Sequence, residues 1–151
     1  MAEDSTELTF DQRVSLITLG VRDIEASRAF YRALGWAEVE APAGVVAFDL
    51  IGQTLGLYPL DMLAADIGVS VETLGHGAMT LAHNVRSKDD VGALMGLAIG
   101  AGGRELRPPS DIFWGGYVGY FADPDGHIWE IAWNPHSPLT DDGAFRWNGY
   151  G

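Results

Sequence analysis

The pattern of apolar and polar residues predicts a strand followed by a helix near the start of the chain. Residues 13–21 are mostly apolar, which is typical of a buried strand. Asp23 stands where its side chain can cap a helix, and Gly35 stands where that helix can end. The apolar face of the predicted helix consists of Ile24, Phe30, Tyr31 and Leu34. Three further strands are expected, over residues 37–40, 45–50 and 54–58.

The same order of elements is predicted again after a connector. Residues 60–73 are expected to form a short helix, capped by Asp61, and a link to the second half. A strand over residues 79–85 then precedes a Ser87-x-x-Asp90 capping box and a helix. The apolar stripe of this helix consists of Val91, Leu94, Met95 and Ala98. Three more strands are expected over residues 104–106, 116–122 and 127–133.

The two halves correspond at an offset of 64 residues, which places Val21-Arg22 on Val85-Arg86. The elements that follow come in the same order in both halves. A repeated supersecondary unit is a stronger signal than any single motif. The sequence therefore predicts a β-α-β-β-β unit that occurs twice.

Charge narrows the classes of partner. The 151 residues include 9 Lys and Arg against 21 Asp and Glu, giving a net charge of −12 and a pI near 4.4. Such a surface repels nucleic-acid phosphates and anionic lipid, so no nucleic-acid or membrane partner is expected. A cationic ligand would be attracted, although acidity also serves solubility. There is no Cys, which excludes disulfides and thiolate ligands.

No targeting or membrane-spanning segment is expected. The start of the chain lacks the basic and apolar regions of a signal peptide. The longest uncharged stretch, residues 91–103, is too short to cross a bilayer. We therefore expect a cytoplasmic protein.

Two segments resemble the vicinal-oxygen-chelate superfamily, which includes glyoxalases, bleomycin-resistance proteins and extradiol dioxygenases. Residues 19–36 are similar to its opening strand and helix, and residues 120–130 to its closing hairpin. The resemblance implies an α+β fold in which two βαβββ modules form a curved, eight-stranded mixed sheet around a cleft, with helices on the convex side. It also implies a homodimer. The expected divisions are a polar arm (1–12), the domain (13–134, with modules at about 13–59 and 77–134 and a connector at 60–76), and an aromatic C-terminal tail (135–151).

The closing hairpin suggests where one carboxylate points. Asp123-Pro124-Asp125-Gly126 fits a type I turn, so the two aspartates are expected to serve the turn before any metal. Strand alternation then separates Trp129, Ile131 and Trp133 from Glu130. The bulky set suits packing beneath a helix. Glu130 is therefore expected on the concave face, which the resemblance identifies as the ligand cleft.

The metal ligands that the resemblance implies are mostly missing. Metal-dependent members hold a divalent ion through four His, Gln or Glu side chains. The corresponding positions here are Leu16, Gly56, Thr80 and Glu130. Such a set does not hold a divalent ion tightly, so no cofactor is expected unless Glu130 is joined by unrecognised ligands. His83 is expected on the opposite, helix-packed face, as a core histidine bonded to backbone.

The face assignments also predict the residues of the cleft. Its expected ligand-binding residues are Leu16, Thr18, Tyr58, Thr80, Asn84, Val118, Tyr120 and Glu130. Tyr58 and Tyr120 are expected to face each other across the cleft, with Trp36, Phe113 and Trp114 at its rim. Glu130 and Tyr120 are the candidate catalytic pair.

Three functions follow as alternatives. The first is metal-free binding of a small organic molecule, as in bleomycin resistance. The second is a metal-dependent glyoxalase-type lyase or isomerase, or a dioxygenase, with a shifted ligand set. The third is a metal-independent enzyme that uses Glu130 and Tyr120 for acid–base chemistry. Fold alone does not choose among them.

Overall fold

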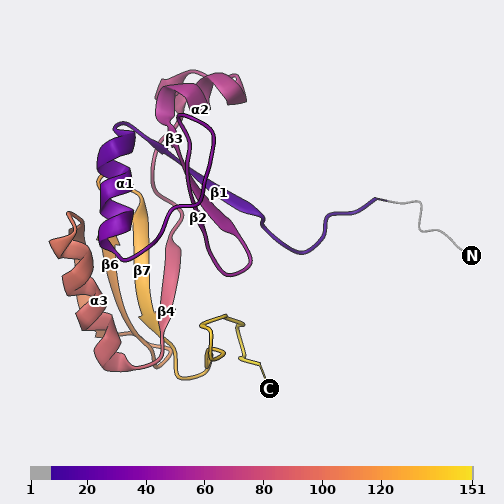
Figure 1. Cartoon of the computed structure of the whole chain (residues 1–151). Helices are drawn as coiled ribbons and strands as arrows, with labels where there is room; N and C mark the ends of the chain where they lie inside the picture. Colours follow the sequence, from indigo (N-terminus) through magenta and orange to yellow (C-terminus); the bar gives the residue numbers. More distant parts are fainter. Residues whose placement is uncertain (1–7, 151) are drawn as a thin grey trace, which may run out of the picture.

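Each half of the chain forms its own sheet in the computed structural model, which describes residues 8–150 (Figure 1). The first module consists of β1 (Leu16–Val21), α1 (Ile24–Ala33), β2 (Val46–Asp49) and β3 (Thr54–Pro59). Its strand order is β1-β3-β2, with β1 parallel to β3 and β2 antiparallel to it. The connector holds α2 (Leu60–Ile67) and a 3-10 turn, η1 (Val71–Thr73).

The second module repeats this topology. It consists of β4 (Leu81–Val85), α3 (Lys88–Gly100), β5 (Arg104–Asp111), β6 (Tyr117–Ala122) and β7 (Ile128–Trp133). The strand order is β4-β7-β6-β5, and β4 is parallel to β7 just as β1 is parallel to β3. The α+β fold and its two related modules, predicted from the sequence, are confirmed.

The strand register supports the equivalence of the two modules at residue level. Thr18 pairs with Gly56 between β1 and β3, and Ala82 pairs with Glu130 between β4 and β7. Thr18 and Ala82 are the same 64 residues apart as the two Val-Arg pairs. Gly56 and Glu130 are therefore equivalent positions, as the sequence comparison assumed.

The predicted eight strands are corrected to seven, in two sheets of three and four strands among the described residues. The missing strand is residues 37–40, which make one isolated bridge, Val39 to Ala47. Two features oppose a longer strand. The Glu38 carboxylate pairs with Arg28 and Arg32 of α1, which ties the segment to the helix. Pro42, which follows at once, has no amide to donate to a neighbouring strand.

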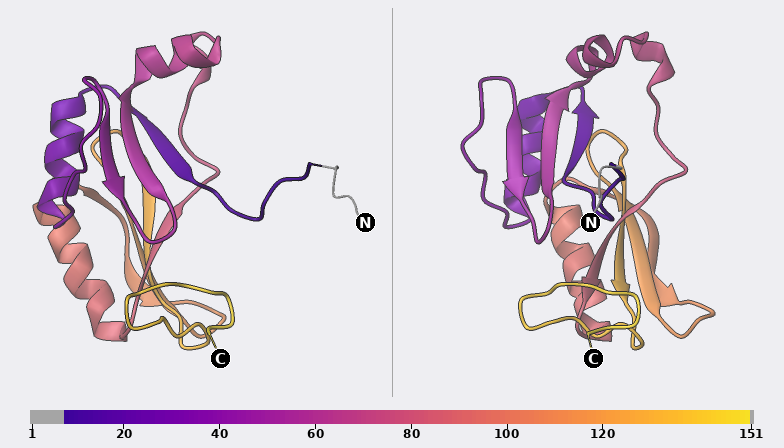
Figure 2. Two further views of the ribbon diagram at one scale, coloured as in Figure 1. Left: turned by 45° about the vertical axis from the view of Figure 1, so that its right-hand side comes forward. Right: turned by 90° about the vertical axis from the view of Figure 1, so that its right-hand side faces the viewer.

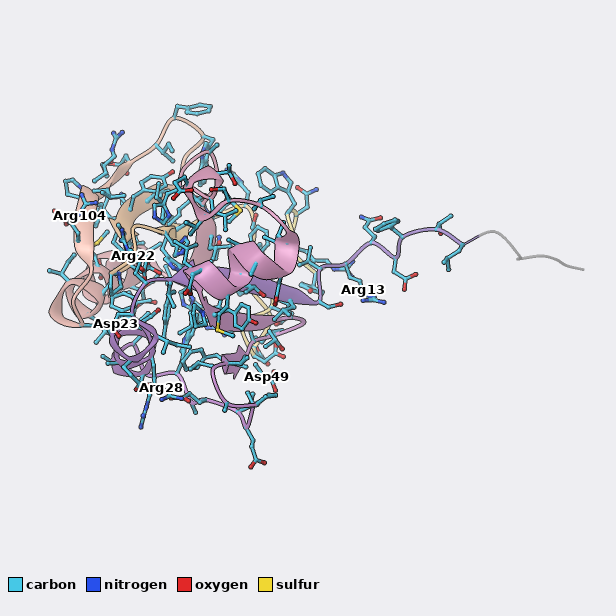
Figure 3. All side chains as sticks on the ribbon, turned by 90° about the horizontal axis from the view of Figure 1, so that it is seen from above. Arg13, Arg22, Asp23, Arg28, Asp49 and Arg104 are labelled. Atoms are coloured by element: carbon cyan, nitrogen blue, oxygen red, sulfur yellow. The ribbon has the colours of Figure 1, made fainter. Side chains whose placement is uncertain are left out.

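Two predicted helix caps also need correction. Asp23 caps α1 as expected, accepting from the amides of Glu25 and Ala26 (Figure 3). For α2 the N-cap is Pro59, so Asp61 lies inside the first turn and not before it. Ser87 is the N-cap of α3, but its side chain makes no cap hydrogen bond, so the expected capping box does not form.

The core lies between the helices and both sheets, and aromatic rings join the two modules there. Helices α1 and α3 lie on one side of the sheets (Figure 1). Phe30 and Tyr31 of α1 lie 6.2 Å from Phe121 and 6.1 Å from Trp129 of the second module, between ring centroids. All four rings are buried. In the described part of the chain, no helix is long and apolar enough to cross a membrane.

The segment after β7 does not extend into solvent. It turns back and crosses the ends of the strands, whereas residues 8–12, before β1, lead away from the body (Figure 2). This crossing brings residues from the end of the chain to the face of β4 and β7 that carries Glu130.

Candidate functional site

A buried carboxylate fixes the turn that precedes the strand of Glu130. Asp123 is 3% exposed, and its Oδ1 accepts from the amides of Asp125 and His127, both at 2.9 Å. Its Oδ2 accepts from the Tyr31 hydroxyl at 2.6 Å, and that hydroxyl accepts from Trp129 Nε1 at 3.0 Å. Burial, followed by the charge of Asp123, raises the pKa of Tyr31, so the phenol remains a donor. The aspartate thus serves the turn, as predicted, and also joins it to α1.

The same turn is tied to the first module at two further points. The Arg22 amide donates to Asp125 Oδ1 at 2.9 Å, and the Arg22 guanidinium lies 3.3 Å from the same oxygen. His127 Nε2 lies 2.8 Å from the Gly20 carbonyl oxygen, which can only accept, so this nitrogen carries the proton. These contacts hold the beginning of β7 against the end of β1.

Strand alternation along β7 then decides which way Glu130 points. Trp129 and Ile131 belong to the buried core beneath the helices. Glu130 and Ala132 lie on the opposite face and line a large cavity. Glu130 therefore lies on the face that the sequence predicted, in the middle of a strand whose start is fixed by the Asp123 network.

The cavity has a volume of about 1260 Å³ and is formed by distant parts of the chain. Its floor is the face of β4 and β7, with Ala82, Asn84 and Glu130. Its walls are the β2–β3 turn, the loop before β6 and the C-terminal segment. The residues of these walls are Leu50, Ile51, Gly52, Gln53, Phe113, Trp114, Asn134, His136, Gly143, Ala144, Phe145, Trp147, Asn148 and Tyr150; Trp36, His83, Trp129 and Ala132 complete the lining.

Glu130 gives the cavity its electrostatic character. Among the described residues, it is the only Asp, Glu, Lys or Arg side chain that lines the cavity. Burial raises the pKa of Glu130, and a hydrogen bond with Thr80 acts in the opposite direction. Burial also raises the pKa of Tyr120, with a further contribution from the charge of Glu130. In the described part of the chain, no Lys or Arg lines the cavity, so the site holds a partly desolvated carboxylate without a lysine or arginine partner in the lining.

The other predicted site residues lie in different surroundings. Asn84 lines the same cavity as Glu130. Tyr120 is the cross-strand partner of Glu130 on β6. Val118 lies two residues before Tyr120 and is 2% exposed. Thr80 is exposed just before β4 and bonds Glu130. These residues are brought together on one side of the second sheet.

The predicted residues of the first module do not reach this cavity. Thr18 lines a separate cavity of about 220 Å³ beside the connector. Leu16 is 54% exposed. The Tyr58 hydroxyl donates to Asp66 of α2 at 2.9 Å, so it is engaged at the connector and not opposite Tyr120. The cavity around Glu130 lies between the second sheet, the β2–β3 turn and the C-terminal segment, and Leu16, Thr18 and Tyr58 are not among its lining residues.

The donor groups do not fit a divalent metal ion. Within the residues described, no three His, Cys, Asp or Glu side chains gather closely enough to hold one. A Cβ at Gly56 would meet Leu16 and Thr18 at ordinary contact distances, so the absence of a side chain there is not imposed by a clash at Cβ. His83 pairs with Ile131, whose face is the helix side, but it lines the Glu130 cavity as well as a smaller cavity against the helices. It is exposed and makes none of the described hydrogen bonds, so the expected core histidine bonded to backbone is wrong.

Sequence reasoning missed the contribution of the C-terminal segment to this site. The sequence identified residues 135–151 only as an aromatic tail, which includes Phe145, Trp147 and Tyr150, and did not place it against the cavity. The contact that sets its position is made by Arg86, 54 residues before Thr140. A single arginine after a strand carries no local signal for such a contact.

Glu130→Gln is expected to raise the free energy of unfolding at pH 7.5, by about 0.5–1 kcal/mol. The folded pKa of Glu130 is raised, so the folded state binds its proton more tightly than the unfolded state does. Stability is therefore lost as pH rises from the ordinary Glu range through the folded pKa. Gln carries no titrating proton and avoids this loss, so the stability difference between the variant and the parent protein should be smaller at pH 5.0. Urea unfolding at both pH values measures this, and a variant that is less stable than the parent at pH 7.5 would contradict it.

Comparisons with known proteins agree with the resemblance seen in the sequence. The profile of the Glyoxalase/Bleomycin resistance protein/Dioxygenase superfamily matches residues 13–131. A glyoxalase-related enzyme from Fulvimarina pelagi is 42% identical, with a TM-score of 0.83 over 90% of this chain and 98% of that one. A lactoylglutathione lyase from Agrobacterium tumefaciens shares the fold at 21% identity, with a TM-score of 0.64 over 82% of this chain and 95% of that one. No match was found among curated proteins.

Proposed function

The chain belongs to the Glyoxalase/Bleomycin resistance protein/Dioxygenase superfamily, and on that premise we propose that it binds a small cationic organic molecule at Glu130 without a metal ion. The observation that carries the proposal is the unpaired carboxylate in a cavity of about 1260 Å³. A site of this kind, mostly apolar with a few placed polar groups, is typical of small-molecule binding.

We propose binding without a metal ion because the side chains at the ligand positions do not supply enough donor atoms. The four positions that carry ligands in metal-dependent members hold Leu16, Gly56, Thr80 and Glu130 here. Leu and Gly offer no side-chain donor. One carboxylate and one hydroxyl fall short of the six to eight oxygens of Ca²⁺ or the four ligands of Zn²⁺. No step of the proposed binding therefore passes through a metal ion.

The preference for a cation follows from the charge of the cavity. A partly desolvated carboxylate is stabilised by an opposite charge, and no Lys or Arg lines the cavity in the described part of the chain to supply one. An amine, amidine or guanidine on the ligand would complete the pair. The net charge of −12 would concentrate such cations at the surface.

The homodimer and the cytoplasmic location expected from the sequence remain parts of this proposal. The homodimer rests on the resemblance to the superfamily. The classes of partner are limited by the net charge of −12. The same charge opposes nucleic-acid and membrane partners.

Titration with 2-naphthamidine, followed by protein NMR, tests the proposal. We expect saturable shifts that centre on the amides of Asn84 and Glu130 and on the Trp114 indole, and purified protein that holds far less than one metal ion per chain. No saturable shift at these residues would overturn ligand binding. Stoichiometric zinc, nickel, iron or manganese that is lost in Glu130→Ala would overturn metal independence.

A second candidate function is acid–base catalysis by Glu130 and Tyr120. The observation in its favour is that burial raises the pKa of both groups, which are cross-strand neighbours on β6 and β7. A carboxylate with a raised pKa suits a general base near neutral pH. Turnover of a carbonyl compound by the parent protein, and its loss in both Glu130→Gln and Tyr120→Phe, would favour this function over binding alone.

A further inference from the structure

The C-terminal segment, residues 134–150, is held to the end of β4 by one arginine. Arg86 Nη1 donates to the carbonyl oxygen of Thr140 at 2.8 Å, and Arg86 Nη2 donates to that of Asp141 at 2.8 Å. Two donors of one planar group thus engage two successive carbonyls, which fixes orientation as well as position. The anchored residues lie four to ten positions before the aromatic residues of this segment that line the cavity.

The anchored residues form a closed turn, so the anchor is transmitted along the chain. The Thr140 amide donates to the Ala144 carbonyl at 3.1 Å, and the Ala144 amide donates to the Thr140 hydroxyl at 2.8 Å. Gly143 within the turn would place a Cβ 3.8 Å from both Arg86 and Ile51 of the β2–β3 turn. The turn therefore lies between the two modules, against each of them.

A second tie holds the segment after the turn. The Ser137 hydroxyl donates to the Trp147 carbonyl oxygen, and Ser137 is 3% exposed. A Cβ on Gly149 would lie 3.0 Å from Pro138, so the chain passes close against itself there. Backbone contacts thus hold residues 145–150 at both ends: the closed turn at residues 140–144 precedes them, and Ser137 and Pro138 contact Trp147 and Gly149.

The aromatic side chains of this fixed segment remain largely uncovered. Phe145, Trp147 and Tyr150 are 42%, 75% and 50% exposed, yet all three line the cavity that contains Glu130. The Arg146 guanidinium lies 4.9 Å from the Tyr150 ring centre, so that ring already faces a cation. Phe145 and Trp147 leave their ring surface free beside the cavity.

We propose that residues 145–150 form an aromatic wall of the ligand site, that the ligand carries a planar aromatic ring beside its cationic group, and that Arg86 is the positioning residue of this wall. The inference rests on the proposed function, because it assigns a ligand class to the same cavity. An uncovered indole on a backbone that is already tied in place offers a ring surface at the cavity, and no backbone segment has to be ordered when a ligand ring stacks on it. Arg86 acts through the backbone of the segment and does not touch the ligand.

Two amidines distinguish the contribution of the aromatic wall to binding from that of the carboxylate. Both 2-naphthamidine and cyclohexanecarboxamidine carry the cation, but only the first carries an aromatic ring. Trp147→Ala is expected to weaken the binding of 2-naphthamidine about three- to tenfold, which is the range that a single aromatic contact supplies. The affinity for cyclohexanecarboxamidine should change less than twofold. Because Trp147 is 75% exposed, its removal should leave the fold intact.

The Arg86 variants test the positioning role. Arg86→Leu should reproduce the selective loss for 2-naphthamidine, and Arg86→Lys, which can still donate to one carbonyl, should recover part of it. Arg104→Leu is the matched control, since it removes the same charge from the outer strand β5, where Arg104 lies at the periphery (Figure 3). It should bind both amidines like the parent protein.

The outcomes separate this inference from the proposed function. If neither amidine binds the parent protein, the proposed function fails and the aromatic wall fails with it. Suppose that both amidines bind the parent protein. If the Trp147 and Arg86 variants then bind both amidines as the parent does, or lose affinity for both equally, the proposed function stands and the aromatic wall is overturned. A selective loss in Arg86→Leu that Arg86→Lys does not recover at all would overturn the hydrogen-bonded anchor.

Discussion

Replacing Asp123 by Ala is expected to lower the free energy of unfolding by about 3–5 kcal/mol, the largest loss of stability for a single truncation in the β6–β7 turn. The carboxylate accepts from two backbone amides and from the Tyr31 hydroxyl while it is 3% exposed. Ala supplies no acceptor, so three donors remain in a site with little access to water. Each buried donor without a partner costs about 1–3 kcal/mol.

Urea unfolding of Asp123→Ala beside Asp11→Ala measures this effect. Asp11 carries the same charge, but its side chain is 74% exposed, so its removal should cost less than about 0.5 kcal/mol. Tyr31→Phe provides a milder step, because it keeps the ring and removes only the hydroxyl between Asp123 and Trp129; we expect about 1–3 kcal/mol. Equal stability of the Asp123 and Asp11 variants would refute the role assigned to the buried network.

Glu130→Gln is expected to weaken binding of 2-naphthamidine at pH 7.5 by about tenfold, the lower end of the range for a charged hydrogen bond because Glu130 is only partly buried. The neutral analogue 2-naphthamide should change less than twofold. Calorimetric titration gives both affinities. Glu105→Gln, on the exposed face of β5, is the charge-matched control and should behave like the parent protein.

The pH dependence gives an independent check on the same carboxylate. Protonation of Glu130 removes the charge that attracts the amidine, so affinity should fall as pH decreases through the folded pKa of this group. Because burial raises that pKa, the fall should begin at a higher pH than for an exposed glutamate. An affinity for 2-naphthamidine that stays constant from pH 7.5 to about pH 4, below the ordinary range of a glutamate, would exclude Glu130 as its partner.

The fold could be predicted because its signals are local. Asp23 caps α1 and the turn at Asp123 forms through contacts within a few residues, so both follow from residue type and spacing. The face of Glu130 follows from alternation along one strand. The strand at 37–40 was overestimated because the ion pairs of Glu38 with α1 are tertiary contacts, which a strand pattern does not encode.

The site was only partly predictable, because its walls are set by contacts between distant residues. Tyr31 and Asp123 are 92 residues apart, and Arg86 and Asp141 are 55 apart. Taken alone, Tyr31 is explained as a core tyrosine and Arg86 as an exposed arginine, so neither residue signals its distant partner. The position of Tyr58 was missed for a different reason. Its hydroxyl donates to Asp66, only eight residues later in α2, and the strand pattern that predicted its face does not encode this side-chain contact.

The central claim is that the cavity around Glu130 binds its ligand without a metal ion. The most direct measurement is the affinity of 2-naphthamidine for one protein preparation after removal of metal with EDTA and again after addition of zinc, nickel, manganese or ferrous iron. The account predicts the same dissociation constant, within twofold, in every sample. Binding that is absent after EDTA treatment and restored by one of these ions would contradict it.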